Sequence, residues 1–357
     1  MKIAVIIAFR GEESLLAWAL AGYAEQELAA GMEVTVWVGG DGVDAEVMPR
    51  VEAGGGGLVR GRSYPRCGAG AVRNRLIAEA AEWGAEMVIF GNADARPAAD
   101  FVRGHVERLR GLPGGSMVLG PAPWEKPERP SVLDALLAET PMVFFYGSLK
   151  TGEWYDFRHA WTLNLSARMA DLRKASGEGP FVDAIRPVYY EDLVMGWRVM
   201  GARKGICFDE GPRVTHRHRT TLEQYLNREE LLGVMAPVVA RHSPEVFGTL
   251  WGGKTAEELA REFRTWVAMD GASHKWIYER LAGWCGQPEA ALGAGEGRER
   301  TLMTIYQMHV PLKRLAFRLG FLRGLELVED GRWEERKAVG LWKKVVGVGQ
   351  EGTASSC

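Results

Sequence analysis

Short apolar runs alternate with amphipathic stretches along the first third of the chain. The runs that have the length and composition of buried strands are residues 2–9, 33–38, 86–91 and 116–120. The stretches with the apolar spacing of a helix are residues 11–30, 71–83 and 98–110. A glycine-rich stretch at 53–70 is expected to be irregular. Strands that alternate with helices at this spacing predict a parallel, doubly wound sheet.

The pattern changes after a proline-rich loop at 121–130. A strand is expected near 203–208, and the chain has helical character from about Thr221 onward. Thr255 and Glu258 have the spacing of a capping box at a helix start. The expected organisation is a first domain over 1–225, a helical extension over 226–290 and a basic, mostly helical region over 291–357, with a linker at 286–298.

Composition excludes several classes of protein. Apolar residues make up 46% of the 357 residues and the net charge is −2, which is typical of a soluble globular protein and argues against a nucleic-acid binder. The opening apolar run is too short for a transmembrane helix and lacks a signal-peptide cleavage region. The cysteines are scattered without metal-ligand spacing, which favours a reducing compartment and a cytoplasmic protein; they are Cys67, Cys207, Cys285 and Cys357.

Polar side chains follow the apolar run at 86–91. Asn92 and Asp94 leave this run on one side, because alternate residues of a strand face the same way. The carboxyl end of a buried strand is where an open α/β sheet binds its ligand. A carboxylate there could hold a hard divalent cation and, through it, a phosphate-bearing substrate. A simple turn at the end of a strand explains the same pattern equally well.

Two glycine-rich turns carry further candidates. Asp41 could accept hydrogen bonds from a base or ribose hydroxyl, although an Asp-Gly pair is also ordinary turn chemistry. The stretch from Gly68 to Arg73 lacks the last glycine of a dinucleotide fingerprint and follows a loop, so it argues little for nicotinamide binding. Arg73 and Arg75 near a helix start suit an anion, or they form a solvated basic face.

Two later pairs complete the candidates. Glu191 and Asp192 precede an amphipathic stretch, where they either complement the helix dipole or supply a general base. His216 and His218 alternate on an extended segment and so share a face, as metal ligands do. They are equally explained as surface residues within a group of arginines that would suit a diphosphate.

In their order along the chain, these segments resemble the family 2 glycosyltransferases, nucleotide-sugar enzymes with the GT-A fold, over about residues 2–220. Ile6 to Glu13 is similar to the family's opening strand and turn, with Ala8 and Gly11 where Pro and Asn are usual. Asp41-Gly42 with Asp44 resembles the family's aspartate-rich turn, and Ala71-Val72-Arg73-Asn74 resembles its A-R-N helix start. Asn92-Ala93-Asp94 stands where the family carries D-x-D, and Glu191-Asp192 with Gly196-Trp197-Arg198 resembles its E-D-x-x-x-G-x-R segment. The segment Val214–His218 resembles the late strand that often supplies a histidine.

The resemblance implies a mixed, doubly wound sheet flanked by helices, with a helical C-terminal extension, and an inverting transfer from a nucleoside diphosphate sugar to an acceptor hydroxyl. Asp192 would be the base, with Glu191 beside it, and a Mn²⁺ or Mg²⁺ ion would be held by Asp94, His216 and His218. The residues implied for donor binding are Ala8, Arg10, Glu12, Asp41, Arg73, Asn92, Ala93 and Asp94. Asn92 replaces the first acidic residue of D-x-D, which removes one charge and lowers the expected metal affinity.

The acceptor would be a glycan, a lipid-linked sugar or another hydroxyl compound. Residues 311–323 interleave basic and apolar side chains, as does Trp342-Lys343-Lys344. Such a helix could lie on an anionic membrane, at its inner face, or pack on the catalytic domain with its arginines in water. The aromatic residues that could contact sugar rings, or simply fill the core, are Trp124, Trp154, Tyr155, Trp161 and Tyr189.

Two rival functions share this pattern. A nucleotidyltransferase would usually carry a basic, glycine-rich phosphate loop after the first strand, whereas residues 8–13 here are acidic at their end. A degenerate module that binds nucleotide sugar or glycan without turnover is supported by Asn92 and opposed by the presence of Asp94, Asp192 and the histidines His216 and His218.

Overall fold

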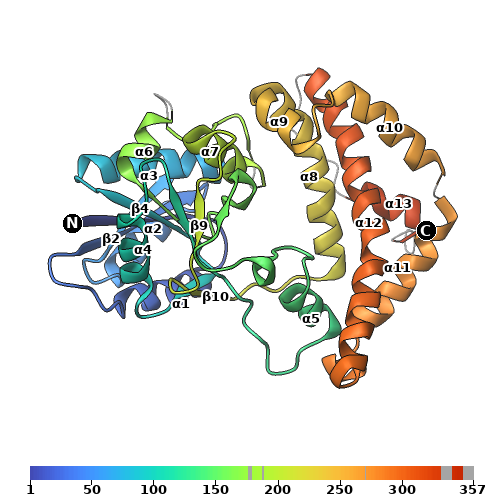
Figure 1. Cartoon of the computed structure of the whole chain (residues 1–357), viewed down its shortest axis with the longest axis horizontal. Helices are drawn as coiled ribbons and strands as arrows, with labels where there is room; N and C mark the ends of the chain where they lie inside the picture. Colours follow the sequence, from blue (N-terminus) through green and yellow to red (C-terminus); the bar gives the residue numbers. More distant parts are fainter. Residues whose placement is uncertain (176–178, 187–188, 270, 331–339, 349–357) are drawn as a thin grey trace, which may run out of the picture. The chain divides into compact units, whose positions relative to one another are not determined.

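The computed structural model describes residues 1–175, 179–186, 189–269, 271–330 and 340–348 (Figure 1). The chain divides into two compact units. The first unit contains Met1–Glu125 and Ser148–His218, and the second contains Lys126–Gly147 and Arg219–Cys357. Residues 126–147, which the predicted first domain included, therefore pack in the second unit. The predicted divisions at 225 and 290 stay predictions, and Cys357 lies outside the described residues.

An eight-stranded sheet forms the centre of the first unit, with strand order β3-β2-β1-β4-β8-β6-β9-β7. Its strands are β1 (Lys2–Phe9), β2 (Glu33–Asp41), β3 (Val59–Tyr64), β4 (Met87–Gly91), β6 (Met117–Leu119), β7 (Trp154–Tyr155), β8 (Asn164–Arg168) and β9 (Ile206–Phe208). The first four strands are parallel, but β8 runs antiparallel between β4 and β6. The sheet is therefore mixed, as the family resemblance predicted, and not purely parallel, as strand–helix alternation alone suggested.

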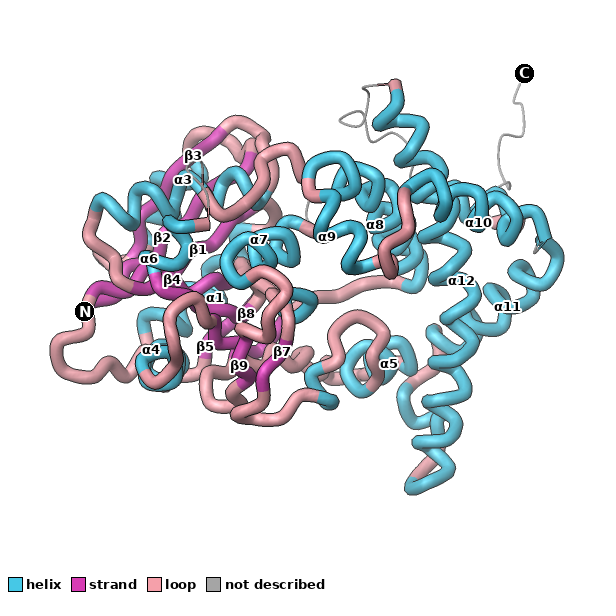
Figure 2. Tube along the Cα trace, turned by 45° about the horizontal axis from the view of Figure 1, so that its top comes forward, coloured by secondary structure: helices cyan, strands magenta, loops and turns pink. Residues whose placement is uncertain are grey.

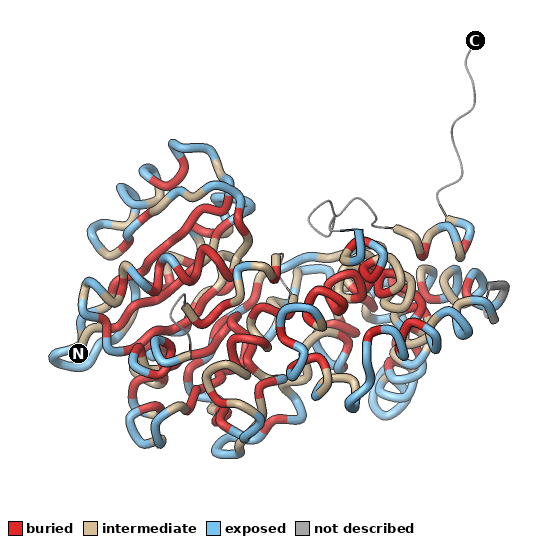
Figure 3. The backbone as a smooth tube through the Cα atoms, turned by 90° about the horizontal axis from the view of Figure 1, so that it is seen from above, coloured by how far each residue is buried: buried red, intermediate tan, exposed pale blue. Residues whose placement is uncertain are grey.

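Helices flank both faces of this sheet (Figure 2). They are α1 (Glu13–Ala24), α2 (Val47–Gly54), α3 (Ala69–Glu82), α4 (Phe101–Arg110), α6 (Met169–Lys174) and α7 (Glu191–Met200). Two consecutive glycines of β2 face opposite sides of the sheet and are covered by different elements. A Cβ on Gly39 would collide with Val72 of α3, and a Cβ on Gly40 would collide with Val43, which precedes α2. Glycine at both positions lets the covering elements approach the strand closely. The central strands β1 and β4 are buried along most of their length, and Figure 3 colours the backbone by this burial.

Two local expectations for the first unit are wrong. The stretch 53–70 is not irregular throughout, because β3 forms the edge of the sheet there. This strand has the burial pattern of an edge, with Arg60 exposed and Val59 and Gly61 buried, and it lacks the continuous apolar run of a central strand. The first helix ends at Ala24, well before Gly31, which instead adopts a positive φ of 78° in the turn before β2.

The second unit is helical. Its elements are α5 (Val132–Glu139), α8 (Leu222–His242), α9 (Pro244–Leu250), α10 (Ala256–Met269), α11 (Gly271–Cys285), the short 3₁₀ turn η3 (Glu289–Leu292), α12 (Gly295–Glu329) and α13 (Leu341–Val346). The long helices α8 and α12 pack side by side (Figure 1). Glycines make this approach possible, because a Cβ on Gly320 would overlap the carbonyl oxygen of Glu230, and one on Gly233 would overlap that of Phe317.

We expect Gly320→Ala to lower the free energy of unfolding of the second unit by about 1–3 kcal/mol, because the added methyl group forces α8 and α12 apart. Gly297→Ala is the matched control: this glycine is also in α12, but nothing lies within 4 Å of its Cβ position. That change should be neutral or stabilising, since alanine is the better helix former. Urea denaturation of the two variants compares them, and equal stability would refute the close-packing account.

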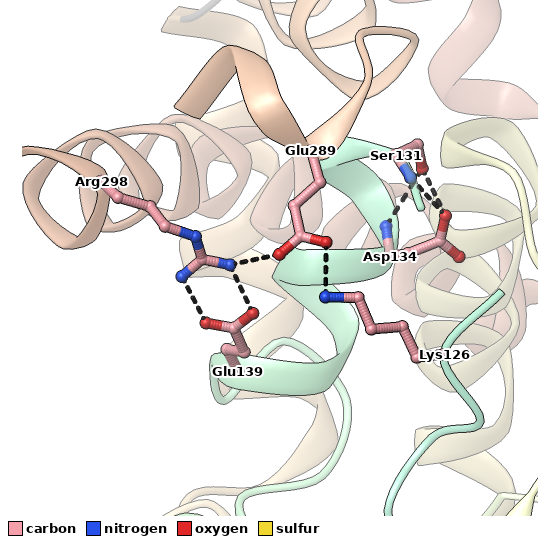
Figure 4. Close-up of polar contacts among 6 residues, drawn as sticks. All are labelled: Lys126, Ser131, Asp134, Glu139, Glu289 and Arg298. Carbon is pink, nitrogen blue, oxygen red and sulfur yellow. Dashed lines mark hydrogen bonds and ion pairs between the residues drawn. The ribbon is translucent and has the colours of Figure 1, made fainter. Parts of the chain in front are cut away.

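Charged side chains tie three segments of the second unit together (Figure 4). Arg298 of α12 makes two 2.7 Å contacts with Glu139 of α5 and a 2.6 Å contact with Glu289, and Glu289 also pairs with Lys126 at 2.9 Å. The capping box at Ser131 starts α5, and the one predicted at Thr255 and Glu258 is confirmed. The predicted linker at 286–298 is instead ordered by η3 and by backbone hydrogen bonds to residues 130 and 132.

Residues 311–323 lie within α12, and their apolar side chains are used in packing. Leu312, Leu315 and Phe321 are buried within the second unit. Trp342 is also buried; its indole donates to Asn227 Oδ1 at 2.8 Å. These residues favour the packing interpretation over insertion of this helix into a membrane. Among the described helices, none combines the length and the apolar character needed to cross a bilayer.

Candidate functional site

The carboxyl ends of three parallel strands meet at one edge of the sheet. Ala8 of β1 is level with Gly39 of β2, and Ile7 is level with Gly91, the last residue of β4. Asp41 ends β2 at this edge, and Asn92, Ala93 and Asp94 follow β4 there. Arg10 and Glu12 leave β1 at the same edge and are exposed. The structure thus places the eight residues predicted for donor binding on elements that reach this edge or start beside it.

A two-stranded ribbon brings the histidines to Asp94. Strand β10 (Val214–His216) pairs antiparallel with β5 (Ala95–Pro97), so that His216 lies opposite Ala95. The Arg217 amide donates to the Asp94 carbonyl oxygen at 2.8 Å, so the backbone pairing of the two segments continues one residue beyond His216. Asp94 Oδ2 then lies 3.3 Å from His216 Nε2 and 3.3 Å from His218 Nδ1. Among the described residues these three form a cluster whose ligand atoms all lie within 4.8 Å of one another.

The surroundings of Asp94 keep it charged. Burial alone would raise the pKa of this carboxyl, but the contacts from His216 and His218 outweigh burial and hold the pKa well below its ordinary value. Asp94 is 23% exposed, His216 7% and His218 49%, so the cluster opens toward solvent on the His218 side. The ring centre of Trp124 lies 4.7 Å from that of His216, so the two rings pack against each other. One carboxylate and two imidazoles suit a divalent transition-metal ion.

Arg73 connects this strand end with the helix that carries the candidate base. Its guanidinium donates to Glu191 Oε1 at 3.1 Å through one nitrogen and to Asn92 Oδ1 at 3.5 Å through the other. Arg73 is 4% exposed and Glu191 is 2% exposed, so the ion pair is almost fully desolvated. Such a pair is costly to break on one side only, because the remaining charge is left buried. The contact therefore holds the start of α7 against the end of β4.

Glu191 and Asp192 differ in their surroundings. Glu191 is committed to structure, since its second oxygen accepts the Tyr189 amide at 2.5 Å. Asp192 is half-buried, accepts the Leu193 amide at 2.8 Å, and forms no ion pair with a described residue. Burial and the nearby charge of Glu191 raise the pKa of Asp192 to about 8, and Arg73 offsets only part of this effect. A carboxylate with a raised pKa can act as a proton acceptor near neutral pH.

Asp41 and Asn74 organise the loops around the site. One oxygen of Asp41 accepts the amides of Cys67 at 2.6 Å and Gly68 at 3.1 Å, just before α3. Asn74 donates to the carbonyl of Phe181 and to Asp183, and its oxygen accepts the Phe181 amide at 3.0 Å. One oxygen of Asp41 is therefore used in the turn before α3, as the simpler interpretation of the sequence held.

Sequence reasoning missed the support of the histidine segment. The guanidinium of Arg217 makes a bidentate contact with Glu125, at 2.7 and 2.6 Å, and lies 4.0 Å from the ring centre of Trp18. Arg217 therefore holds the loop between the two histidines instead of facing a diphosphate. The alternation of Arg217 with His216 and His218 was a usable signal, because it puts the arginine on the opposite face. Nothing local in the sequence marked Glu125 or Trp18.

Solved structures with a similar fold include glycosyltransferases. The mannosyltransferase PcManGT from Pyrobaculum calidifontis, in complex with GDP-Man and Mn²⁺, is 14% identical over 94% of this chain and 88% of its own, with a TM-score of 0.48. The 1-349 segment of S. aureus TarS in complex with UDP-GlcNAc is 16% identical over 93% of both chains, with a TM-score of 0.46. The chain has the mixed α/β sheet flanked by helices that the resemblance implied.

GalNAc-T7 with UDP, GalNAc and Mn²⁺ is a further similar structure, 12% identical over 64% of this chain and 48% of its own, with a TM-score of 0.44. No protein-family model matches the sequence, and no curated protein matches it.

Proposed function

We propose that this chain is an inverting glycosyltransferase of the family 2 type, which moves a sugar from a nucleoside diphosphate sugar to an acceptor hydroxyl. The observation that carries the proposal is the double contact of Arg73. One buried guanidinium joins Asn92, two residues from the metal-ligand cluster, to Glu191, the neighbour of the candidate base. A charged donor site and a proton acceptor are thereby held in one network, as a displacement at a sugar carbon requires.

The cluster of Asp94, His216 and His218 fits the divalent ion that the resemblance implies, because its three ligand atoms converge. Two imidazoles favour Mn²⁺ over Mg²⁺, which prefers oxygen ligands and ideal octahedral geometry. A bound ion would neutralise charge on the diphosphate leaving group. The side-chain oxygen of Asn92 accepts a hydrogen bond from Arg73. Asn92 would therefore position the Arg73 guanidinium as well as contact the nucleotide-sugar donor.

Asp192 would accept the proton of the attacking hydroxyl, since it is the carboxylate of this network without a cationic partner among the described residues. Arg73 would act as a positioning residue, because both of its terminal nitrogens are engaged. A single displacement of the nucleoside diphosphate by the acceptor hydroxyl, assisted by one base, would invert the configuration at the anomeric carbon of the sugar. Turnover is favoured over binding alone because Asp192, unlike Glu191 and Asp94, forms no ion pair with a described residue and so has an oxygen for a substrate proton.

The acceptor is proposed to be a glycan or a lipid-linked sugar, with Trp124 beside the site as one surface for a sugar ring. Contact with an anionic membrane would have to come from the basic side chains of α12, since its apolar side chains in 311–323 are largely used in packing. Trp161 is buried in the first unit and is assigned to the core.

A panel of nucleoside diphosphate sugars, scored by thermal stabilisation with and without Mn²⁺, tests donor binding. We expect one nucleoside class to raise the unfolding temperature in the presence of Mn²⁺ and to lose this effect when EDTA is added. Free nucleosides serve as the control, because they lack the diphosphate that the ion would contact. Equal stabilisation by the free nucleosides, or none by any donor with Mn²⁺ present, would contradict the proposed donor site.

A further inference from the structure

Asn74 of α3 holds the segment 179–186, which precedes α7 in the chain. Its side-chain oxygen accepts the Phe181 amide at 3.0 Å, and its side-chain nitrogen donates to the Phe181 carbonyl oxygen and to Asp183 Oδ1, each at 2.9 Å. The oxygen and both hydrogens of this side-chain amide are therefore used. One side chain pairs both backbone groups of Phe181, as a neighbouring strand would. The proposed sugar transfer gives Asn74 no part.

Two glycines allow this segment to approach α3 closely. Gly179 has a positive φ of 111°, and a Cβ there would lie 2.5 Å from Asn74 Oδ1. A Cβ on Gly70 of α3 would come within 3.2 Å of the Cβ of Phe181 and within 3.5 Å of the Cβ of Glu191. The segment and the start of α7 therefore meet at the same place on α3.

The ring of Phe181 covers the ion pair of Arg73 and Glu191. Phe181 is 1% exposed, and its ring centre lies 5.7 Å from the guanidinium carbon of Arg73. The same ring packs edge to face on Phe90 of β4, with 5.7 Å between the ring centres. An aromatic face attracts a cation and excludes water from it. The position of Phe181 therefore helps to keep the ion pair dry.

The covered ion pair contains the two charged side chains that act on Asp192. Glu191 precedes Asp192 on α7 and raises the pKa of its carboxyl, whereas Arg73 lowers that pKa; burial, which raises it, has the largest effect. The backbone amides of Leu193 and Thr162 also donate to Asp192. Water admitted beside these charges would raise the local dielectric and weaken the effects of burial and of Glu191.

We propose that Asn74 is a positioning residue of the candidate active site. It holds the ring of Phe181 over the buried ion pair, and this cover keeps water from the charges beside Asp192. An aliphatic side chain in place of Asn74 would leave two buried backbone groups of Phe181 unpaired. The inference rests on the proposed function, because the proton affinity of Asp192 matters to a reaction only if Asp192 is a base.

A pH titration of the full-length protein labelled with ¹³C in its aspartate carboxyl groups tests the proposal by NMR, with no donor or acceptor present. The signal of Asp192 is identified by its absence in Asp192→Asn. Its midpoint should lie near the raised pKa of about 8 in the wild type. In Asn74→Ala and in Phe181→Ala the midpoint should move to lower pH by about one pH unit or more, because both changes admit water. The rising limb of the transfer rate against pH should move with it.

Asn227→Ala is the matched control, because Asn227 belongs to the second unit and accepts a hydrogen bond from the Trp342 indole at 2.8 Å. It should leave the midpoint unchanged. If Asn74→Ala does not fold, Phe181→Ala decides, since it keeps the hydrogen bonds of Asn74 to the backbone. An unmoved midpoint in a folded variant would overturn the inference, whether or not the wild type transfers sugar. A moved midpoint with no transfer by the wild type would support the cover and refute the proposed transfer.

Discussion

Asp192→Asn should reduce sugar transfer by about 10²- to 10⁴-fold, the usual contribution of a positioned general base. The substitution keeps the shape of the side chain, and its oxygen can still accept the Leu193 amide. The pair of Arg73 with Glu191 does not involve Asp192, so the donor site should keep its form. Initial rates of nucleoside diphosphate release with acceptor present, together with the dissociation constant of the donor, measure the two effects separately.

Asp100→Asn provides the control for this change, because Asp100 is an exposed carboxylate of the same unit whose side chain makes no cap hydrogen bond. It should leave both quantities unchanged. If Asp192→Asn weakens donor binding as much as it slows transfer, Asp192 is a structural residue and the base assignment is wrong.

The pH profile gives a second readout of the same assignment. A base accepts a proton only when it is deprotonated, and burial and Glu191 raise the pKa of Asp192 to about 8. The transfer rate of the wild type should therefore rise with pH through this region and be low below it. In Asp192→Asn the residual rate should lose that limb, whereas a purely structural role would only scale the profile down.

Asp94→Asn should weaken Mn²⁺-dependent donor binding by at least about 10- to 100-fold, the loss seen even when a residue behind a metal ligand is removed. Asp94 is the anionic member of the cluster, and its loss leaves two neutral or like-charged imidazoles that attract a cation less well. Titration of Mn²⁺ at fixed donor concentration measures the change. Unaltered Mn²⁺ dependence in the variant would show that the ion binds elsewhere; Asp100→Asn again provides the matched control.

The main strands of the sheet could be predicted from sequence because each central strand carries its own apolar run. Residues 2–9 and 86–91 match β1 and β4 closely. The antiparallel position of β8 between β4 and β6 could not be predicted from the strand pattern, because strand direction depends on pairing between segments far apart in the chain. The edge strand β3 was missed because only one of its faces is covered and its residues are mostly polar.

Local signals located the strand ends and the histidine segment, and the structure brings Asp94, His216 and His218 together. Their roles stay predictions. The function of Arg73 could not be inferred locally, because its partner Glu191 is 118 positions away in the sequence. From sequence alone, an arginine near a helix start is expected to bind an anion. The structure instead pairs Arg73 with the buried carboxylate of Glu191.

The most direct test of the central claim is the release of nucleoside diphosphate from each of a set of nucleotide sugars, followed over time with Mn²⁺ and with EDTA. Slow hydrolysis of the donor by water uses the same leaving group, so it needs no knowledge of the acceptor. The account predicts release from donors of one nucleoside class, dependent on Mn²⁺ and reduced in both Asp94→Asn and Asp192→Asn. Donor binding without release from any nucleotide sugar, with or without candidate acceptors, would contradict it and identify a binding module.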